Sequence, residues 1–462
     1  MKKGLVIFLF SISWQFIFAT TYYVSPHGNN ANPGTLTKPW ATPGYASQRL
    51  KPGDTLIILG GKYILSQYPD DIIRPSSGTA SAWIKICGEP GKRPMLLGQD
   101  NLLTAIDLSG VKYIRLENLE ICHNSAARGE EVFFRDGIEI LGAPAEHIIL
   151  KDLYIHHLDE FGINIQDIFD LKIEDCRIEY CGFGALGGPA GEKGGWQNVN
   201  IQNCRLTWSG HYYQGTDGKT RPYDRPDGFG IEQSKGPIWI EDCYVAHNYG
   251  DGIDSKAHHT TINRCIVANN SCDGVKLWGD QSRIINTLIY GRGDGDDRET
   301  PWSAIVIAPE KQPNAKFEII NVTVDDWVGK NYLMHVQYDY PDVPAQVILR
   351  NNIFSSRGPN APIFIGRAST LLAENNLFFF PKNEFILNHG EKSFNRQTIS
   401  SLGKNNIYGD PLFKKPTWGG DGDYSLTQGS PAIDVGTNTG APELDLLKRT
   451  RRLPIDLGAL EY

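Results

Sequence analysis

Long apolar runs, blocks of basic residues and helical periodicity are all scarce in this chain. After the first 18 residues, no stretch approaches the roughly 18 uninterrupted apolar residues that a membrane-spanning helix needs. The net charge is −8 and no cluster of Lys or Arg marks a phosphate-tracking surface, so nucleic acid is excluded as an expected partner. Apolar residues rarely recur at helical spacing, which excludes a helical bundle.

Several common site signatures are missing as well. The chain has no Gly-rich phosphate loop and no Gly-x-Ser-x-Gly elbow, which argues against nucleotide chemistry and against an α/β-hydrolase site. The adjacent residues His258 and His259 do not have the spacing of zinc ligands, and the cysteines are expected mainly in the interior. Zinc is therefore not expected.

The chain begins with a targeting pattern. Two lysines precede an apolar run that ends at Phe18, and Ala19 completes a small-residue cleavage pattern. This arrangement is typical of a secretory signal peptide over residues 1–19, with a retained signal anchor as the alternative. The mature chain is predicted to start near Thr20, to be secreted or periplasmic, and to have no transmembrane segment.

One motif recurs three times in the middle of the chain. Asp227-Gly228-Phe229, Asp251-Gly252-Ile253 and Asp273-Gly274-Val275 follow one another at separations of 24 and 22 residues, which indicates a solenoid with one supersecondary unit per repeat. Each unit holds short runs rich in Ile, Val, Leu and Tyr, separated by Gly, Asn and Asp, which is a strand-and-turn pattern. A β-propeller blade needs roughly 40 residues, about twice this unit. The period therefore predicts an all-β fold of stacked parallel strands, a parallel β-helix.

Cysteines mark the same period. Four of them follow a shared local pattern with Ile three residues earlier: Cys176, Cys204, Cys243 and Cys265. The positions that align with them before and after are Leu119, Leu153, Leu288, Thr323, Asn352 and Asn376. We expect this column to stack inside the coils, where cysteine packs as a small apolar residue. The other cysteines lie outside the column, and disulfide pairing among them stays open: Cys87, Cys122, Cys181 and Cys272.

No linker divides the mature chain, so residues 20–462 are predicted to form a single β-helix domain, expected to be a monomer. An N-terminal cap is expected at about 20–63, with a short helix within 41–49, because an open coil end exposes a sheet edge. Coils are expected at about 83–379 and a closing segment at about 380–462.

Two insertions interrupt the period on either side of the repeated motif, at about 208–226 and 291–302. Loops that project from a rigid solenoid are common sites of recognition. Aromatic rings can stack on sugars and arginine can hold a uronate carboxylate in a bidentate way. The predicted substrate-binding residues here are Arg221, Tyr223, Arg225, Arg292 and Arg298. The alternative is that these loops are solvated and bind nothing.

The residue after each repeated motif differs, and this suggests chemistry. If Ile253 and Val275 point inward, then Asp254 and Lys276 point outward on successive coils. Asp227 and Asp251 occupy equivalent positions, so three carboxylates converge and would repel one another without a cation. Calcium suits such an oxygen site because it tolerates irregular geometry. The simpler alternative is an ion pair between Asp254 and Lys276, worth only ~0–1 kcal/mol if exposed.

Two further outward residues, Lys256 and Trp278, complete the predicted substrate-binding set, and Lys256 is also a rival to Lys276 as a base. The three motifs together resemble those of the calcium-dependent pectate and rhamnogalacturonan lyases of polysaccharide lyase family nine, which are right-handed parallel β-helices. The resemblance lies in Asp227-Gly228-Phe229, Gly250-Asp251-Gly252-Ile253-Asp254 and Gly274-Val275-Lys276. It implies that Asp227, Asp251 and Asp254 bind Ca²⁺ and that Lys276 is the catalytic base. Gly250 stands where the family pattern has an additional aspartate.

The function expected from this resemblance is calcium-assisted β-elimination of an acidic, uronic-acid-containing and pectin-like polysaccharide. A glycoside hydrolase is the first alternative, and it would use two of the three aspartates as acid and base or nucleophile. A noncatalytic exported carbohydrate-binding protein is the second, since fold alone does not fix function.

Overall fold

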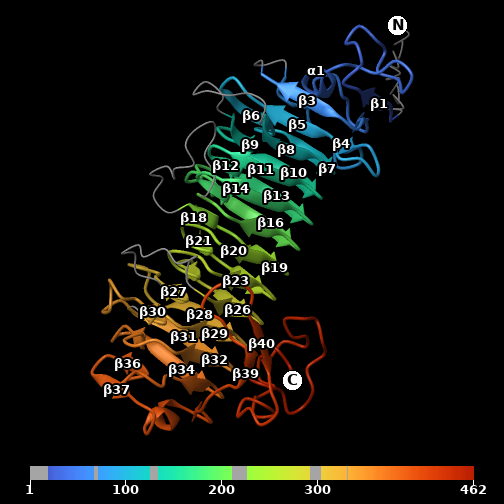
Figure 1. The fold of residues 1–462 in the computed structure, drawn as a ribbon. Helices are drawn as coiled ribbons and strands as arrows, with labels where there is room; N and C mark the ends of the chain where they lie inside the picture. Colours follow the sequence, from blue (N-terminus) through green and yellow to red (C-terminus); the bar gives the residue numbers. More distant parts are fainter. Residues whose placement is uncertain (1–18, 67–70, 125–133, 211–225, 292–302, 330) are drawn as a thin grey trace, which may run out of the picture.

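The computed structural model describes residues 19–66, 71–124, 134–210, 226–291, 303–329 and 331–462. Residues 1–18 of the predicted signal peptide lie outside the described residues, as do Arg221, Tyr223, Arg225, Arg292 and Arg298 of the predicted substrate-binding set. Within the described ranges, no helix is long and apolar enough to cross a membrane. The chain forms an elongated stack of coils that runs from the blue strands to the orange strands of Figure 1, and the red C-terminal segment lies beside the stack.

Three sheets run along the stack, and successive strands visit them in turn. Sheet I contains β1 (Thr21–Val24), β2 (Thr55–Ile58), β4 (Ile84–Gly88), β7 (Lys112–Glu117), β10 (Ala145–Lys151), β13 (Ile168–Glu174), β16 (Trp196–Gln202), β19 (Ile238–Glu241), β22 (Thr260–Asn263), β25 (Ser282–Ile285), β28 (Ala315–Ile320), β31 (Ala345–Arg350) and β34 (Thr370–Glu374). Sheet II contains β3 (Lys62–Leu65), β5 (Met95–Gly98), β8 (Glu120–His123), β11 (Tyr154–Leu158), β14 (Arg177–Cys181), β17 (Arg205–Thr207), β20 (Tyr244–Ala246), β23 (Ile266–Ala268), β26 (Leu288–Tyr290), β29 (Thr323–Asp326), β32 (Ile353–Ser356), β35 (Leu377–Phe379) and β38 (Ile407–Tyr408). Sheet III contains β6 (Leu102–Asp107), β9 (Phe134–Ile140), β12 (Phe161–Ile165), β15 (Gly184–Gly187), β18 (Asp227–Ser234), β21 (Ile253–Ala257), β24 (Val275–Leu277), β27 (Ile305–Ile307), β30 (Met334–Val336), β33 (Ile363–Ile365), β36 (Leu387–His389) and β37 (Lys392–Phe394).

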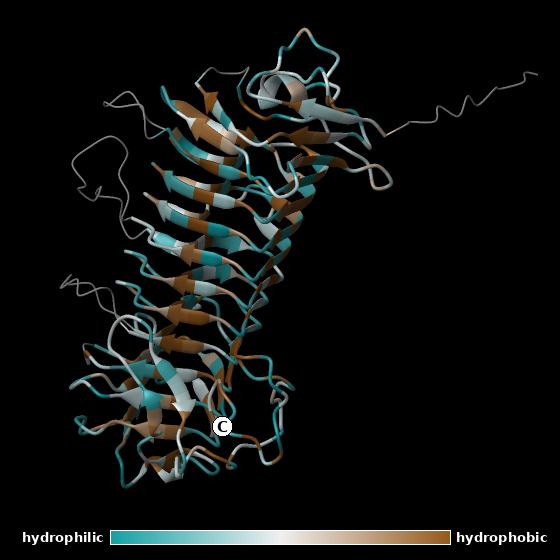
Figure 2. Ribbon diagram, turned by 45° about the vertical axis from the view of Figure 1, so that its right-hand side comes forward, coloured by the Kyte–Doolittle hydropathy of each residue, from teal (hydrophilic) through white to brown (hydrophobic). Residues whose placement is uncertain are grey.

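Neighbouring strands within these sheets pair in parallel, apart from the antiparallel pair β36 and β37 among the described residues. The all-β parallel β-helix predicted from the 22- to 24-residue period is therefore confirmed. Buried apolar residues at corresponding positions of successive coils form one continuous core along the stack. Hydrophobic segments recur along the stacked strands in Figure 2. Because each coil buries its apolar face only against its neighbours, the fold is a one-dimensional stack on which a site can be read rung by rung.

The turn from sheet I to sheet II explains the cysteine column. One residue of each coil adopts a positive φ at this turn, usually Asp or Asn, as in Asp175 (58°) and Asn203 (53°), residue types that tolerate the left-handed region. The next residue points inward, and Cys176, Cys204 and Cys243 are each at most 3% exposed there. The predicted interior stacking of these thiols is confirmed, and all eight cysteines are free.

The sequence alignment of this column was wrong by one residue at Leu288 and Thr323, and it was right again at Asn352 and Asn376. Leu288 pairs with Ile266 in sheet II, and the backbone N–H of Cys265 donates to Thr287 Oγ1 at 3.4 Å, so Thr287 continues the column. Val322 follows in place of Thr323, because its N–H donates to Asn352 Oδ1 at 2.9 Å. The error arose because neighbouring residues at these turns are both buried, Thr287 with Leu288 and Val322 with Thr323, so the hydrophobic pattern did not fix the register.

The two ends of the stack are covered differently. At the N-terminal end, helix α1 (Pro43–Ser47) lies within the 41–49 range predicted for a capping helix. At the other end a 3-10 helix, η1 (Ile399–Leu402), lies against β38, the last strand of sheet II. The hairpin of β39 (Phe413–Lys415) and β40 (Asp423–Leu426) folds back from this end and packs on the side of sheet II, against residues of β20, β23 and β26. The predicted domain boundaries remain predictions.

Candidate functional site

The repeated aspartates form a ladder where successive strands of sheet III begin, because each one accepts a hydrogen bond from the next coil. The backbone N–H of Asp251 donates to Asp227 Oδ1 at 2.7 Å, and that of Asp273 donates to Asp251 Oδ1 at 2.7 Å. Ser303 continues the pattern by donating to Asp273 Oδ1 at 2.8 Å. Each carboxylate therefore accepts a backbone N–H of the following coil with one oxygen, and its second oxygen can accept another hydrogen bond or bind a cation.

The same ladder contact exists away from this cluster, which shows that part of the motif is structural. Asp136, fully buried on β9, accepts the backbone N–H of Phe161 at 2.9 Å through Oδ1. Its Oδ2 accepts from Asn164 Nδ2 at 3.0 Å. An aspartate at this position of a coil thus has a folding role on its own, and only the convergence of several of them indicates a site.

The glycine of each motif is required by packing. A Cβ on Gly228 would lie 2.5 Å from Val245 Cγ1, and one on Gly252 would lie 2.5 Å from Val267 Cγ1, distances that real side chains do not adopt. Glycine therefore lets sheet III approach sheet II closely at each aspartate. In each Asp-Gly pair the aspartate directs its carboxylate outward, and the glycine leaves room inside for the neighbouring sheet. Both requirements repeat in these successive coils, so the pair repeats as well.

Asp227, Asp251 and Asp254 come together as the sequence predicted. Each offers a carboxylate oxygen, and these oxygens all lie within 4.8 Å of one another. Gly230, which pairs with Asp254 in the register of β18 and β21, keeps the space open, because a Cβ there would lie 2.5 Å from Asp227 Oδ2. An all-oxygen set of three carboxylates around a cradle that a single methyl group would fill fits a hard divalent cation such as Ca²⁺.

Charge repulsion in the cluster is large. Burial, together with the carboxylates of Asp251 and Asp254, raises the pKa of Asp227 well above its ordinary value. Burial and then Asp251 raise the pKa of Asp254 to about 7 and that of Asp273 to about 8. These carboxyl groups hold protons more readily than an ordinary aspartate does, and a positive charge close to them would favour their ionised forms, which is the second sign that the cluster suits a cation.

Lys276 is the one amine that contacts the ladder among the described residues. Its Nζ lies 3.7 Å from Asp251 Oδ2 and 3.9 Å from Asp273 Oδ2. Burial lowers its pKa, but the carboxylates of Asp251, Asp254 and Asp273 outweigh burial and leave the pKa raised. The ion pair with Asp254 weighed from the sequence is replaced by pairs with the two ladder aspartates. The amine becomes available as a base only when the carboxylate charges are offset.

Lys256 follows Asp254 by two residues, and Trp278 follows Lys276 by two residues. Both predicted residues therefore lie on the same outward face of sheet III. Lys256 Nζ pairs with Glu232 Oε1 at 2.6 Å, so its charge is already compensated. Trp278 donates its indole N–H to Asp254 Oδ1 at 2.6 Å. The Trp278 ring also lies below both amines, 5.6 Å from Lys256 Nζ and 5.2 Å from Lys276 Nζ. Trp278 thus holds the Asp254 carboxylate by a hydrogen bond and makes cation–π contacts with the ammonium groups of Lys256 and Lys276.

Two hollows on sheet III meet at Lys276, and we call the two together the groove. One of about 380 Å³ is lined by Phe161, Phe183 and the acidic cluster. The other, of about 330 Å³, is lined by Asp273, Tyr332 and Tyr338, and Lys276 borders both. Phe161 and Phe183 have ring centroids 4.8 Å apart, and those of Tyr332 and Tyr338 are 5.3 Å apart. The charged centre therefore has an aromatic pair on each side.

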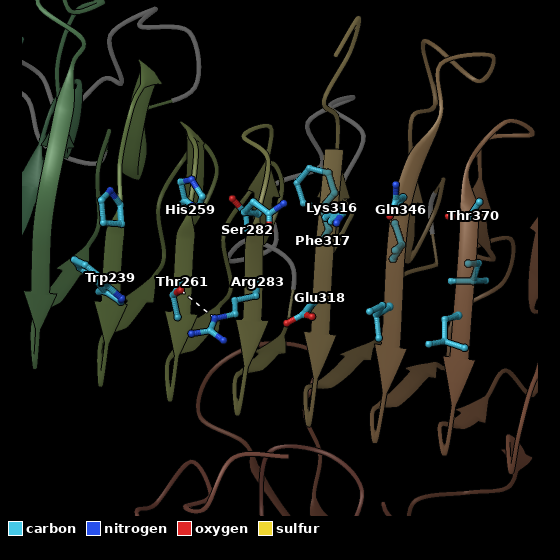
Figure 3. A pocket seen from close by; sticks show the side chains of 16 residues that line it. Trp239, His259, Thr261, Ser282, Arg283, Lys316, Phe317, Glu318, Gln346 and Thr370 are labelled. Atoms are coloured by element: carbon cyan, nitrogen blue, oxygen red, sulfur yellow. Dashed lines mark hydrogen bonds between the residues drawn. The ribbon is translucent and has the colours of Figure 1, made fainter. Parts of the chain in front are cut away.

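A larger hollow lies elsewhere, on the outer face of sheet I (Figure 3). Its volume is about 840 Å³, and its walls include Trp239, Thr261, Arg283 and Lys316 from successive strands. Within it, Arg283 Nε donates to Thr261 Oγ1 at 3.2 Å. It contains none of the converging carboxylates, and size alone does not make it the site of chemistry.

Sequence reasoning missed Asp273 and the aromatic pairs as site residues. Asp273 stands in the third copy of the repeated motif, and that signal could have identified it. In the strand register, Phe161 and Tyr332 align with the aspartates of the ladder, two coils beyond its first and last aspartates. The sequence alone does not show this alignment. Glu232, which holds Lys256, had no distinguishing signal.

Comparisons with known proteins agree with this architecture. The crystal structure of pectate lyase Pel9A has a TM-score of 0.52 at 16% identity, with 96% of each chain covered. The complex of XylC with xylose has a TM-score of 0.57 at 11% identity, covering 96% of this chain and 98% of that one. A rhamnogalacturonan lyase has a TM-score of 0.40 at 16% identity, with 96% of each chain covered. The likeness to the first two structures supports a shared fold only.

Comparison with curated protein sequences gave no significant match. A family model described as "Pel9A-like, right handed beta helix region" matches residues 22–283, which is more than half of the chain and contains the three repeated motifs. The chain therefore belongs to the Pel9A-like right-handed β-helix family.

Proposed function

We propose that this protein is a polysaccharide lyase that cleaves an acidic, uronic-acid-containing and pectin-like glycan by β-elimination with the help of Ca²⁺. The observation that carries the proposal is Lys276, an amine held 3.7 Å from Asp251 between three clustered carboxylates and an open groove. A hydrolase needs two carboxyl groups and has no use for such an amine. The predicted exported location and monomeric state accompany this proposal.

The chain's own residues would divide the work as follows. Lys276 takes the proton from C5 of a uronate unit, the C5–H electron pair becomes the C4=C5 double bond, and the C4–O bond breaks with its pair leaving on the departing sugar. Asp227, Asp251 and Asp254 would hold the cation, and the indole N–H of Trp278 would keep Asp254 in position. When bound there, the cation would offset the carboxylate charges around Lys276 and bind the uronate carboxylate, which acidifies the C5 proton.

The direct test is incubation of the purified protein with homogalacturonan, rhamnogalacturonan and alginate, with and without a chelator. We expect unsaturated, ultraviolet-absorbing products from at least one polymer, lost with the chelator and restored by Ca²⁺. Saturated reducing ends that form in the chelator would instead support a hydrolase. Binding of polymer without any product would support the noncatalytic alternative. Either result would overturn the lyase proposal.

The aromatic pairs define where the polymer should lie. Phe161 and Tyr332 stand at corresponding positions six rungs apart, on the order of 29 Å at ~4.8 Å per rung, with the acidic cluster between them. That length accommodates several sugar units, so substrate contacts should extend to both sides of Lys276.

Loss of an aromatic ring should weaken binding without impairing the chemical step. We expect Tyr332→Ala and Phe161→Ala each to raise KM by about 5- to 30-fold on a long polymer with kcat changed by less than about 3-fold, since a stacked ring contributes roughly 1–2 kcal/mol. Steady-state kinetics on long and short oligomers provide the measurement. Phe169→Ala, an exposed phenylalanine on β13 of sheet I, is the control. Unchanged KM in both groove variants would place the polymer elsewhere.

A further inference from the structure

A second group of metal-binding side chains lies on sheet II, far from the aspartate ladder in the fold. Glu120 and Cys122 stand two residues apart on β8, with Ile121 buried in the core between them, so both point outward. The register of β8 and β11 places His156 directly beside Cys122. A carboxylate oxygen, a thiol sulfur and an imidazole nitrogen of these three residues lie within 4.8 Å of one another.

The three side chains are shielded rather than solvated. Cys122 is 5% exposed, and the side chains of His156 and Glu120 are 13% and 19% exposed. Sequence reasoning placed the cysteines mainly in the interior and saw no zinc spacing, but Cys122 belongs to the outer face. Its ligand partner His156 is 34 residues away in sequence and adjacent only through the coil register. No local motif could have revealed the group.

The surroundings orient His156 as a ligand would need. His156 Nε2 lies 3.3 Å from Glu120 Oε1. The other ring nitrogen, Nδ1, lies 2.6 Å from Nδ1 of His157, whose ring is stacked on Tyr180 at 4.9 Å. A metal-bound imidazole usually donates its second N–H to a fixed acceptor, and His157 can be that acceptor.

The neighbouring carboxylate is not a competing ligand. Glu179 lies beside His156 in the register, but Arg177 contacts both of its oxygens, at 2.7 and 2.8 Å. Tyr154 OH also donates to Glu179 Oε1 at 2.8 Å. These contacts satisfy Glu179, whereas the side chain of Glu120 contacts the imidazole of His156. Glu120 is therefore the carboxylate positioned to bind an ion.

We propose that Glu120, Cys122 and His156 form a binding site for Zn²⁺, separate from the aspartate ladder and with a fourth coordination position left for water. Thiolate, imidazole and carboxylate are the ligands zinc uses, and three protein ligands with one open position is a frequent arrangement. Ca²⁺ takes oxygen ligands and would not select this set. Ligand atoms around one tetrahedral ion lie about 3–4 Å apart, so small side-chain rotations would complete the site.

The test is titration of the full-length protein with Zn²⁺, by calorimetry in a reducing buffer with excess Ca²⁺ to occupy the oxygen site. We expect one equivalent of Zn²⁺ to bind, and Co²⁺ to give a thiolate-to-metal absorption band. Cys122→Ser should abolish that band and the tight equivalent. Glu120→Gln, at a partly exposed position that tolerates the change, should weaken Zn²⁺ binding by at least about 10-fold. Circular dichroism checks that the variants fold.

Cys87→Ser is the matched control, because Cys87 is an 8%-exposed thiol on β4 of sheet I, outside this group. It should keep both the equivalent and the Co²⁺ band. Asp251→Asn should keep the Zn²⁺ equivalent too, which separates this proposal from the lyase proposal. Absence of Zn²⁺ binding in the parent protein, or binding that survives both Cys122→Ser and Glu120→Gln, would overturn the site.

Discussion

Lys276→Arg is expected to lower kcat by about 10²- to 10⁴-fold while the protein folds normally, because a positioned general base contributes about that factor. Arginine keeps the positive charge beside Asp251 and Asp273, 3.7 and 3.9 Å from the present amine. Its guanidinium does not lose a proton in proteins, so it cannot take one from C5. Initial rates of double-bond formation on the best uronan would provide the measurement.

Two matched variants decide whether Lys276 acts as a base or only as an ion-pair partner. If its role is structural, Lys276→Arg should retain nearly full activity. Lys256→Ala tests the rival base: Lys256 pairs with Glu232 at 2.6 Å, so we expect a raised KM and a kcat reduced by less than about 10-fold. A larger kcat loss in Lys256→Ala than in Lys276→Arg would reverse the assignment.

The sequence was sufficient for the fold class and for the centre of the candidate site, and the reason is local regularity. Between Asp227 and Lys276 the coils follow one another at 24 and 22 residues, so a counting argument correctly places Asp227, Asp251 and Asp254 together. Inward and outward positions then follow from strand alternation alone. No long-range information was needed there.

Elsewhere the counting argument fails, both where two neighbouring residues suit the same buried position and where coils differ in length. Thr287 rather than Leu288 continues the cysteine column, and Tyr332 joins the ladder column only through the pairing of β27 with β30. Cys122 and His156 become neighbours through the pairing of β8 with β11. Hydrophobic patterns accept a one-residue shift when both residues suit a half-buried strand, so only the hydrogen-bonded register decides which side chains meet.

The Asp-Gly motif also carries two functions that the sequence could not separate. Asp136 shows that the aspartate can serve only as an acceptor for the next coil's backbone, here the N–H of Phe161 at 2.9 Å. Asp251 makes the same kind of contact, to the N–H of Asp273 at 2.7 Å, and in addition shares a cluster with two other carboxylates. The Asp-Gly motif therefore predicts the hydrogen bond between coils. Whether a cation site also forms depends on how many carboxylates converge.

Asparagine substitution separates these two functions. Asp251→Asn keeps an amide oxygen for the N–H of Asp273 but removes one of three converging charges. We expect Ca²⁺ affinity to fall by about 100-fold or more, since loss of an outer-shell partner alone costs about 10- to 100-fold, and lyase activity to fall with it. Asp136→Asn is the control, because it alters the same ladder contact outside the cluster, and it should leave Ca²⁺ affinity within about 2-fold.

Stability provides an independent readout with a defined sign. The pKa values of Asp254 and Asp273 are raised in the folded chain to about 7 and about 8, so their contribution to stability is full below the ordinary carboxyl pKa and is lost as pH rises through 7 to 8. In a chelator, Asp251→Asn removes the shared repulsion, so its Tm at pH 8 should exceed that of the parent protein. Added Ca²⁺ should raise the parent's Tm and change the variant's much less. A parent protein whose Tm ignores both pH and Ca²⁺ would mean that the three carboxylates form no cation site.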